Sequence, residues 1–130
     1  MREILFRGKN GTRWFYGWYC GKTLTIDMSD TEECSQIIDF NTLYWHVVDP
    51  KTVGQFTGVF DKNGKKIFEG DIVRAEMICN GDTWAGYVVW WHGCFAIQEA
   101  RTRNVPAIDL FRGYEIIGNI HDNPELLEVE

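Results

Sequence analysis

The fold is decided by residues 54–73, which read GQFTGVFDKNGKKIFEGDIV. Two apolar stretches flank the pair Asn63-Gly64, and Asn-Gly is a dipeptide that suits the positive φ angles of tight hairpin turns. Further on, Gly70 can adopt a backbone conformation that other residues avoid, and Asp71 can accept hydrogen bonds from nearby backbone N–H groups. The stretch therefore predicts a β-hairpin followed at once by a reversal into a third strand.

The same pattern of short apolar runs between turn signals extends over the rest of the chain. Asn10-Gly11 and Asn80-Gly81 are flanked in the same way. The expected strands cover residues 3–7, 13–20, 22–28, 34–40, 43–48, 54–60, 65–69, 72–79, 83–91, 94–99 and 114–120. No segment of ten or more residues shows a clean helical period, so the sequence predicts a mainly β fold.

Two breaks organise this succession of strands. Residues 29–33 are predicted to form an acidic surface loop, and Asp49-Pro50 interrupts the apolar pattern. We therefore expect an N-terminal β meander over residues 1–50 and a second β unit over 51–130, which can also pack as a single domain. At the end of the chain, Asn123-Pro124 has the N-cap and first-turn residues of a short helical turn.

The composition is that of a globular protein and excludes several classes. The chain has 130 residues, of which 45% are hydrophobic and 25% charged. This length suffices for one compact domain, or for one domain with a small appendage. No apolar run approaches the roughly 20 residues that cross a bilayer, and the first residues lack the apolar stretch of a signal peptide. We expect a cytoplasmic protein that does not enter membranes.

Charge is distributed unevenly along the chain. Residues 1–25 have a net charge of +4, residues 26–50 of −6, residues 51–112 of +1 and residues 113–130 of −5, which sum to −6. An acidic protein is a poor non-specific ligand for nucleic acid. The acidic stretch 27–39 can instead pair with the basic N-terminal region of a second copy, which would give a salt-sensitive homo-oligomer.

Aromatic residues are unusually numerous, with six Trp, five Tyr and eight Phe. Trp14, Tyr16 and Trp18 alternate along one predicted strand, so they share a face. In one interpretation this face is the core. In the other, Trp14 and Trp18 stack on nucleic-acid bases. The binding residues that we predict are Arg13, Trp14, Trp18, Trp91, Arg101 and Arg103; Trp90 and Trp91 are adjacent, so one of them should reach a surface or an interface.

No catalytic or metal-binding pattern stands out. The four cysteines, at positions 20, 34, 79 and 94, form no CxxC pair, and His92-x-Cys94 is the only close pairing of ligand types. We expect four buried or half-buried free thiols. Glu69 and Asp71 can share a face as a carboxylate pair, but the turn already explains Asp71. The sequence predicts no enzyme, no metal and no cofactor.

The chain resembles the YopX family, small proteins found mostly in bacteriophages and prophages. The resemblance lies in residues 2–7, 49–58, 61–73, 86–90 and 116–127, and it is weak over 12–48. Its most recognisable residues, which we interpret as architectural, are Gly54, Gly58, Asn63, Gly64, Glu69, Gly70, Asp71, Gly118 and Asn119.

The resemblance implies a mostly β protein whose later part, residues 51–130, looks like an SH3-like small β barrel, and it implies no particular activity. Such a barrel offers an aromatic groove and sheet edges to an extended partner. We therefore expect a non-enzymatic, protein-binding or regulatory accessory protein whose partner is a phage or host protein or a second copy. Nucleic-acid binding by a basic, aromatic face is the alternative.

Overall fold

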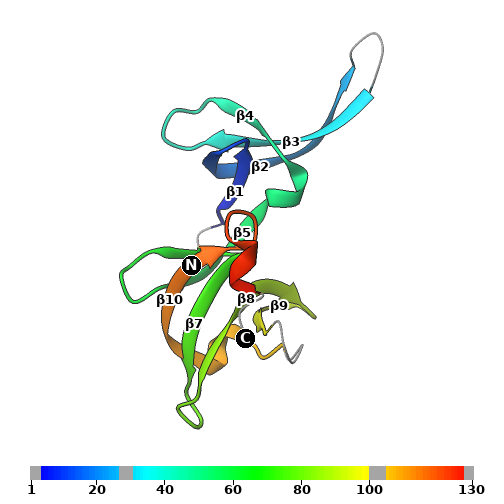
Figure 1. Ribbon diagram of the computed structural model, residues 1–130. Coiled ribbons are helices and arrows are strands. Elements are labelled where there is room, and N and C mark those ends of the chain that lie inside the picture. Colours follow the sequence, from blue (N-terminus) through cyan, green and yellow to red (C-terminus); the bar gives the residue numbers. More distant parts are fainter. Residues whose placement is uncertain (1–3, 27–30, 100–104, 128–130) are drawn as a thin grey trace. The chain divides into compact units, whose positions relative to one another are not determined.

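The computed structural model describes residues 4–26, 31–99 and 105–127 of the chain (Figure 1). Its elements, in order, are β1 (Phe6–Asn10), β2 (Arg13–Ile26), β3 (Thr31–Asp39), β4 (Trp45–Val48), the 3-10 turn η1 (Pro50–Thr52), β5 (Gly54–Phe60), β6 (Lys66–Phe68), β7 (Asp71–Met77), β8 (Thr83–Trp91), β9 (Cys94–Gln98), η2 (Ile108–Leu110), β10 (Phe111–Asn119) and η3 (Pro124–Leu127). Strands dominate, and the described helical segments are short 3-10 turns. The predicted mainly β fold class is confirmed.

The strands form two antiparallel sheets and the chain divides into two compact units. One sheet has the order β4-β3-β2-β1-β5-β6 and the other the order β10-β7-β8-β9. The N-terminal unit is Met1–Phe56 and the C-terminal unit is Thr57–Glu130, so the division falls within β5.

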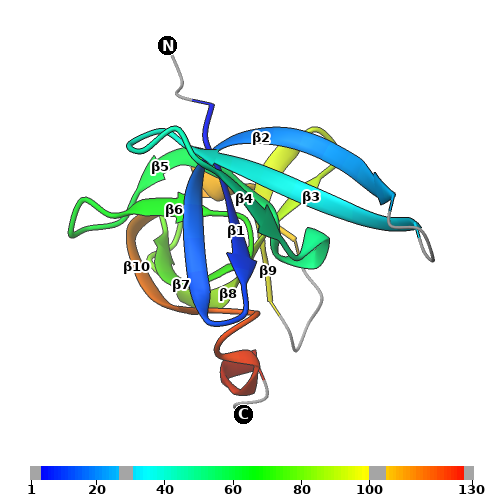
Figure 2. The ribbon, with the colours of Figure 1, turned by 90° about the horizontal axis from the view of Figure 1, so that it is seen from above.

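The N-terminal unit is a β meander, but its strands begin and end elsewhere than the sequence predicts. The predicted strands 13–20 and 22–28 are one strand, β2, whose register shifts between Tyr19 and Lys22. A local bulge absorbs the irregularity, so no turn is needed there. β3 begins at Thr31, within the predicted surface loop, and pairs with the end of β2. Figures 1 and 2 show β2 and β3 extending together as a two-stranded ribbon.

The first hairpin is tighter than predicted. The sequence places a turn over residues 8–11, whereas β1 continues to Asn10, which pairs with Arg13. The turn is therefore Gly11 with Thr12, and Gly11 has a φ of 62°. This positive φ suits glycine at the first position of a two-residue hairpin loop.

The end of the meander returns to its first strand. The backbone N–H of Asp49 donates to the carbonyl of Lys9 at 2.8 Å, and the side-chain amide of Asn10 donates to the carbonyl of Val47 at 2.9 Å. Gly8 is required at this approach, because a Cβ there would lie 2.6 Å from a methyl group of Val48. The curled sheet encloses a small core built from Phe15, Ile37 and Val48.

The C-terminal unit has the larger core. Residues from β6 to β10 and η2 converge in it, and five partly buried side chains pack around them. The buried members are Ile67, Val73, Ala75, Val88, Phe95, Ile97, Ile108 and Phe111. The closure of this unit as an SH3-like barrel stays a prediction.

The chain's described part ends in the predicted helical turn, η3, which follows Asn123. The carbonyl of Asn123 accepts a hydrogen bond from the backbone N–H of Leu126 at 3.1 Å. The short C-terminal helical turn is confirmed. Within the described residues, no helix has the length and the apolar character that a membrane crossing requires.

Candidate functional site

The aromatic stripe of β2 lies on the outside of the N-terminal unit. Phe15 is buried and Tyr19 packs against the core, so alternation turns Trp14, Tyr16 and Trp18 to the opposite face. Tyr16 and Trp18 are exposed, and half of the surface of Trp18 is accessible. The interpretation that this stripe forms the core is wrong. The core uses the other parity of β2, where Phe15 meets Ile37 and Val48.

Two cations of β1 lie beside Trp14 on this outer face. Lys9 pairs with Trp14 and Arg7 with Tyr16 across the hairpin. The guanidinium carbon of Arg7 lies 4.6 Å from the centre of the Trp14 ring, and the ammonium nitrogen of Lys9 lies 5.8 Å from it. Both geometries are cation–π contacts. Only 5% of Arg7 is accessible.

Arg13 does not join this group. Its guanidinium carbon lies 5.1 Å from the centre of the Phe15 ring, so it belongs to the other parity of the strand. Of the predicted binding residues, the structure thus brings together Trp14 and Trp18 and separates Arg13 from them. Arg101 and Arg103 lie outside the described residues.

An apolar surface continues from Trp18 across the next two strands. Trp18 pairs with Ile38 of β3, and Ile38 pairs with Trp45 of β4. The rings of Trp18 and Phe40 are 6.1 Å apart in an edge-on arrangement. We call the following exposed residues of β2, of the loop between β3 and β4, and of β4 the aromatic face: Tyr16, Trp18, Phe40, Leu43, Tyr44, Trp45 and Val47.

The loop between β3 and β4, which contains Phe40, Leu43 and Tyr44, is held by Asp39. The carboxylate oxygen Oδ1 of Asp39 accepts from the backbone N–H groups of Asn41 at 2.8 Å and Thr42 at 3.2 Å. Its backbone carbonyl accepts from the N–H of Leu43 at 2.6 Å, and its own N–H donates to the carbonyl of Tyr44 at 3.0 Å. These four hydrogen bonds hold the loop in one conformation, and we call them the Asp39 frame.

Leu43 occupies a left-handed conformation in this frame. Its φ is 62°, and 64% of its surface is accessible. A left-handed conformation costs an ordinary residue about 1–2 kcal/mol. The side chain gains little burial in return for this cost.

The predicted residue Trp91 lies in the C-terminal unit. Trp90 and Trp91 are both about half exposed, and the ring of Trp90 packs edge-on against Phe95 at 4.8 Å. Trp91 contacts the ring of His92, at 4.6 Å. His92 and Gly93 form the turn between β8 and β9, and both have a positive φ, 47° and 84°. Two positive φ values are typical of a type I′ hairpin.

The described thiols and imidazoles do not gather at one place, and the side chains of Cys20 and Cys34 lie outside the described part of the structure. Cys79 and Cys94 are exposed free thiols, so the expectation of burial is wrong for these two, because both lie at hairpin ends. The ring of His46 stacks on Phe15 at 3.9 Å. Within the described residues, no three His, Cys, Asp or Glu side chains gather as a metal site would require.

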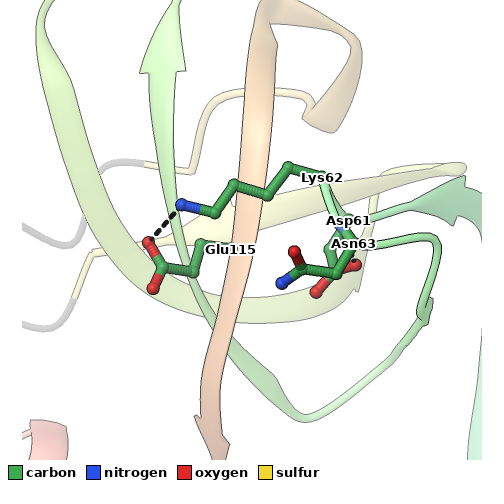
Figure 3. A network of polar contacts seen from close by, with 4 residues as sticks. All are labelled: Asp61, Lys62, Asn63 and Glu115. Carbon is green, nitrogen blue, oxygen red and sulfur yellow. Dashed lines mark hydrogen bonds and ion pairs between the residues drawn. The ribbon is translucent and has the colours of Figure 1, made fainter.

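The family-like residues near Asn63 build a turn. Asp61 is buried and lies close to Asn63 in the turn (Figure 3). Its Oδ1 accepts from the backbone N–H groups of Asn63 at 2.9 Å and Lys65 at 2.8 Å. Burial alone would raise the pKa of Asp61, but these hydrogen bonds, a third from the backbone of Ile116 and the charge of Lys65 outweigh it, so the pKa lies below its usual value.

The same turn is tied to β10 from its exposed side. The ammonium group of Lys62 lies 3.2 Å from the Oε2 of Glu115, as the dashed line in Figure 3 shows. The backbone N–H of Lys62 also donates to the carbonyl of Tyr114 at 2.8 Å. Gly58 and Gly64, on either side of this turn, have φ values of 86° and 82°, which favour glycine.

The second family-like turn reverses the chain at Gly70, whose φ is 88°. The Oδ2 of Asp71 accepts from the N–H of Phe68 at 2.8 Å, which is the predicted role of Asp71. Gly70 itself bonds through its N–H to Val88 and through its carbonyl to Ile120. The carboxylate of Asp71 is buried within this turn, whereas Glu69 is half-buried.

The remaining family-like positions close the end of β10 and the start of β5. Asn119 Oδ1 accepts from the N–H groups of His121 at 3.0 Å and Asp122 at 2.8 Å. A Cβ on Gly118 would lie 2.7 Å from Asn123 and 2.9 Å from Leu126. Gly54 pairs with Arg7 of β1.

The sequence prediction missed the loop residues Phe40, Leu43 and Tyr44 and the β4 residue Trp45. A signal was present, because Leu43, Tyr44 and Trp45 are three large apolar residues in succession. One face of a strand cannot bury all three.

No curated protein matches the chain. A family model described as YopX protein matches residues 6–128, which is nearly the whole chain and includes both units. The chain therefore belongs to the YopX family.

Proposed function

We propose that this chain is a phage- or prophage-encoded accessory protein that works in the cytoplasm as a non-enzymatic, protein-binding module. The observation that carries the proposal is the aromatic face, which places Trp18, Trp45 and Tyr44 on the surface of a unit whose core is small. Clustered exposed apolar residues on a folded protein mark contact sites more often than isolated ones do.

The composition of the aromatic face also suits a protein partner. Tryptophan and tyrosine are enriched among the residues that dominate binding energy at protein interfaces. The Asp39 frame fixes Leu43 and Tyr44 before a partner arrives, which reduces the ordering cost of association.

The test is a random peptide library displayed on particles and selected on the immobilised full-length chain. We expect enriched peptides to bind the wild type and to lose at least about tenfold in affinity to the double variant Trp18→Ala, Trp45→Ala. The matched control is Trp91→Ala, which removes a comparably exposed tryptophan from the C-terminal unit. If the selected peptides lost as much affinity for the control variant as for the double variant, this assignment would be contradicted.

Nucleic-acid binding is a second candidate, favoured by the contacts of Arg7 and Lys9 with Trp14. Bases stack on exposed aromatic rings, and cations beside the rings neutralise phosphates. However, Arg7 is almost completely buried and the chain has a net charge of −6. We therefore expect no tryptophan quenching by single-stranded or duplex DNA or RNA between about 50 and 200 mM salt. Quenching that weakens steeply with salt would favour the second candidate.

A further inference from the structure

The three Asn-Gly pairs of this chain differ in how the structure holds them. The asparagines, Asn10, Asn63 and Asn80, are all exposed, and each precedes a glycine with a positive φ. An asparagine before glycine loses its side-chain amide more easily than other asparagines, because glycine has no side chain to obstruct its backbone nitrogen. The pairs are therefore three candidate sites of one chemical modification, and the hydrogen bonds around them decide which one reacts.

The modification is deamidation through a cyclic imide. The backbone nitrogen of the glycine loses its proton and attacks the side-chain carbonyl carbon Cγ of the asparagine before it. A C–N bond forms, the Cγ–Nδ2 bond breaks, and the amide nitrogen leaves as ammonia. Water then adds to one of the two imide carbonyls, which opens the ring to aspartate or to isoaspartate. An acceptor that holds the glycine N–H slows the first step, because that hydrogen bond must break before the nitrogen attacks.

Two of the three glycine N–H groups are held in this way, both in the C-terminal unit. The N–H of Gly64 donates to the carbonyl of Asp61 at 3.0 Å, and the N–H of Gly81 donates to the carbonyl of Met77 at 2.9 Å. Attack on the asparagine before either glycine therefore requires the turn to open first.

The third pair, Asn10-Gly11, is built differently. Asn10 and Arg13 are the last strand pair of the β1–β2 hairpin, and Gly11 and Thr12 are the loop between them. Within the described residues, the N–H of Gly11 has no hydrogen-bond acceptor. The nitrogen next to Asn10 is thus able to attack without first breaking a hydrogen bond of its own.

The side-chain amide of Asn10 joins β1 to β4. Its Nδ2 donates to the carbonyl of Val47 at 2.9 Å in an exposed hydrogen bond, which opens without unfolding of the strands. A carboxylate only accepts hydrogen bonds, so deamidation replaces this bond with two acceptors that face each other. Isoaspartate also adds a methylene group to the main chain before Gly11, which disturbs the pairing of residue 10 with Arg13.

We propose that Asn10 is a site of spontaneous deamidation in the folded chain, and that its conversion to aspartate or isoaspartate releases β4 from β1. The reaction consumes only water. It is irreversible because the ammonia diffuses away, so the converted fraction increases with the age of the molecule. The inference does not depend on the proposed function, although β4 contributes Trp45 and Val47 to the aromatic face.

The rates are measured on the full-length chain, incubated at a mildly alkaline pH. Peptide mapping by mass spectrometry follows each asparagine, because a deamidated peptide gains the mass difference between an amide and a carboxylic acid. We expect Asn10 to convert about threefold to tenfold faster than Asn63 and Asn80, which corresponds to the net contribution of one hydrogen bond. In concentrated guanidinium chloride the three rates should converge, since all three asparagines precede glycine.

Two results would overturn the assignment of the site. In the first, Asn10 in the folded chain converts no faster than Asn63 and Asn80. In the second, the advantage of Asn10 persists unchanged in denaturant, which would mean that it comes from neighbouring sequence and not from the hydrogen bonds of the fold.

The structural consequence is tested with Asn10→Asp and the matched control Asn80→Asp. The control makes the same change in a turn of the C-terminal unit, where aspartate keeps the acceptor that Asn80 presents to the N–H of Asp82. Amide hydrogen exchange in β4 should become at least about threefold faster with Asn10→Asp and stay unchanged with Asn80→Asp. Equal exchange of β4 in the wild type and in Asn10→Asp would refute the release of β4.

Discussion

The two units of this protein use their large apolar residues differently. In the C-terminal unit eight buried residues form the core, and the family-like glycines and aspartates close its turns. Among the described residues of the N-terminal unit, Phe15, Ile37 and Val48 form a small buried cluster, while Trp18, Tyr44 and Trp45 are on the surface. The comparison teaches that most of the family-like turn residues lie in the C-terminal unit, whereas most of the exposed aromatic residues lie in the N-terminal unit. Sequence resemblance is strongest where residues serve architecture, because turns require particular residue types.

The largest expected effect comes from removing a fully buried isoleucine in each unit. Ile67→Ala and Ile37→Ala should each lower the free energy of unfolding by about 2–5 kcal/mol, since both side chains are inaccessible. In hydrogen exchange, Ile37→Ala should remove protection from β1–β4 and leave β7–β10 protected. Simultaneous loss of protection in both units would show that they unfold together and would contradict two independently stable cores.

A smaller effect is expected at two glycines that face a close neighbour. Gly8→Ala places a Cβ 2.6 Å from Val48, and Gly118→Ala places one 2.7 Å from Asn123. Each should lower the free energy of unfolding by about 1–3 kcal/mol, measured by urea denaturation. A suitable control for added bulk is Ala85→Val, at an exposed position of β8. A Gly8→Ala protein as stable as the wild type would show that Val48 does not hold β4 against β1.

Asp61→Asn tests how firmly the family-like turn depends on charge. The pKa of Asp61 is lower in the folded chain than in the unfolded chain, so its ionised form stabilises the fold. That stabilisation is complete above the unfolded pKa and is lost as the pH falls through the folded pKa. At pH 7 the variant should be less stable by about 1 kcal/mol, because the amide accepts weaker hydrogen bonds.

The pH dependence supplies the control for this variant. Below about pH 4 the difference between wild type and Asp61→Asn should shrink in acid denaturation curves. A difference that stays constant down to pH 2 would mean that the charge of Asp61 contributes nothing to the turn.

The smallest expected effect on stability is at the two described non-glycine residues with a positive φ. Leu43→Asn and His92→Asn should each raise the free energy of unfolding by up to about 1 kcal/mol, since asparagine tolerates a positive φ better than leucine or histidine. Thermal denaturation measures this change. If Leu43→Asn instead destabilised the chain, the side chain of Leu43 would belong to the architecture of the N-terminal unit.

Local sequence determined much of this protein. Alternation along 13–19 and the glycines at positions 11, 64 and 70 fixed strands and turns, because period and positive φ are properties of short segments. The roles of Asp71 and of the Asn123-Pro124 turn followed from the same local chemistry.

Tertiary structure decided which face of each strand is inside. Alternation states that Phe15 and Trp18 point in opposite directions, but it contains no information about which direction leads to the core. That choice depends on Ile37 and Val48, which return to Phe15 from more than twenty residues away. The Asp39 frame and the left-handed Leu43 likewise arise only when β3 and β4 pair. The aromatic face is therefore a product of long-range packing, and single-strand periodicity was unable to predict it.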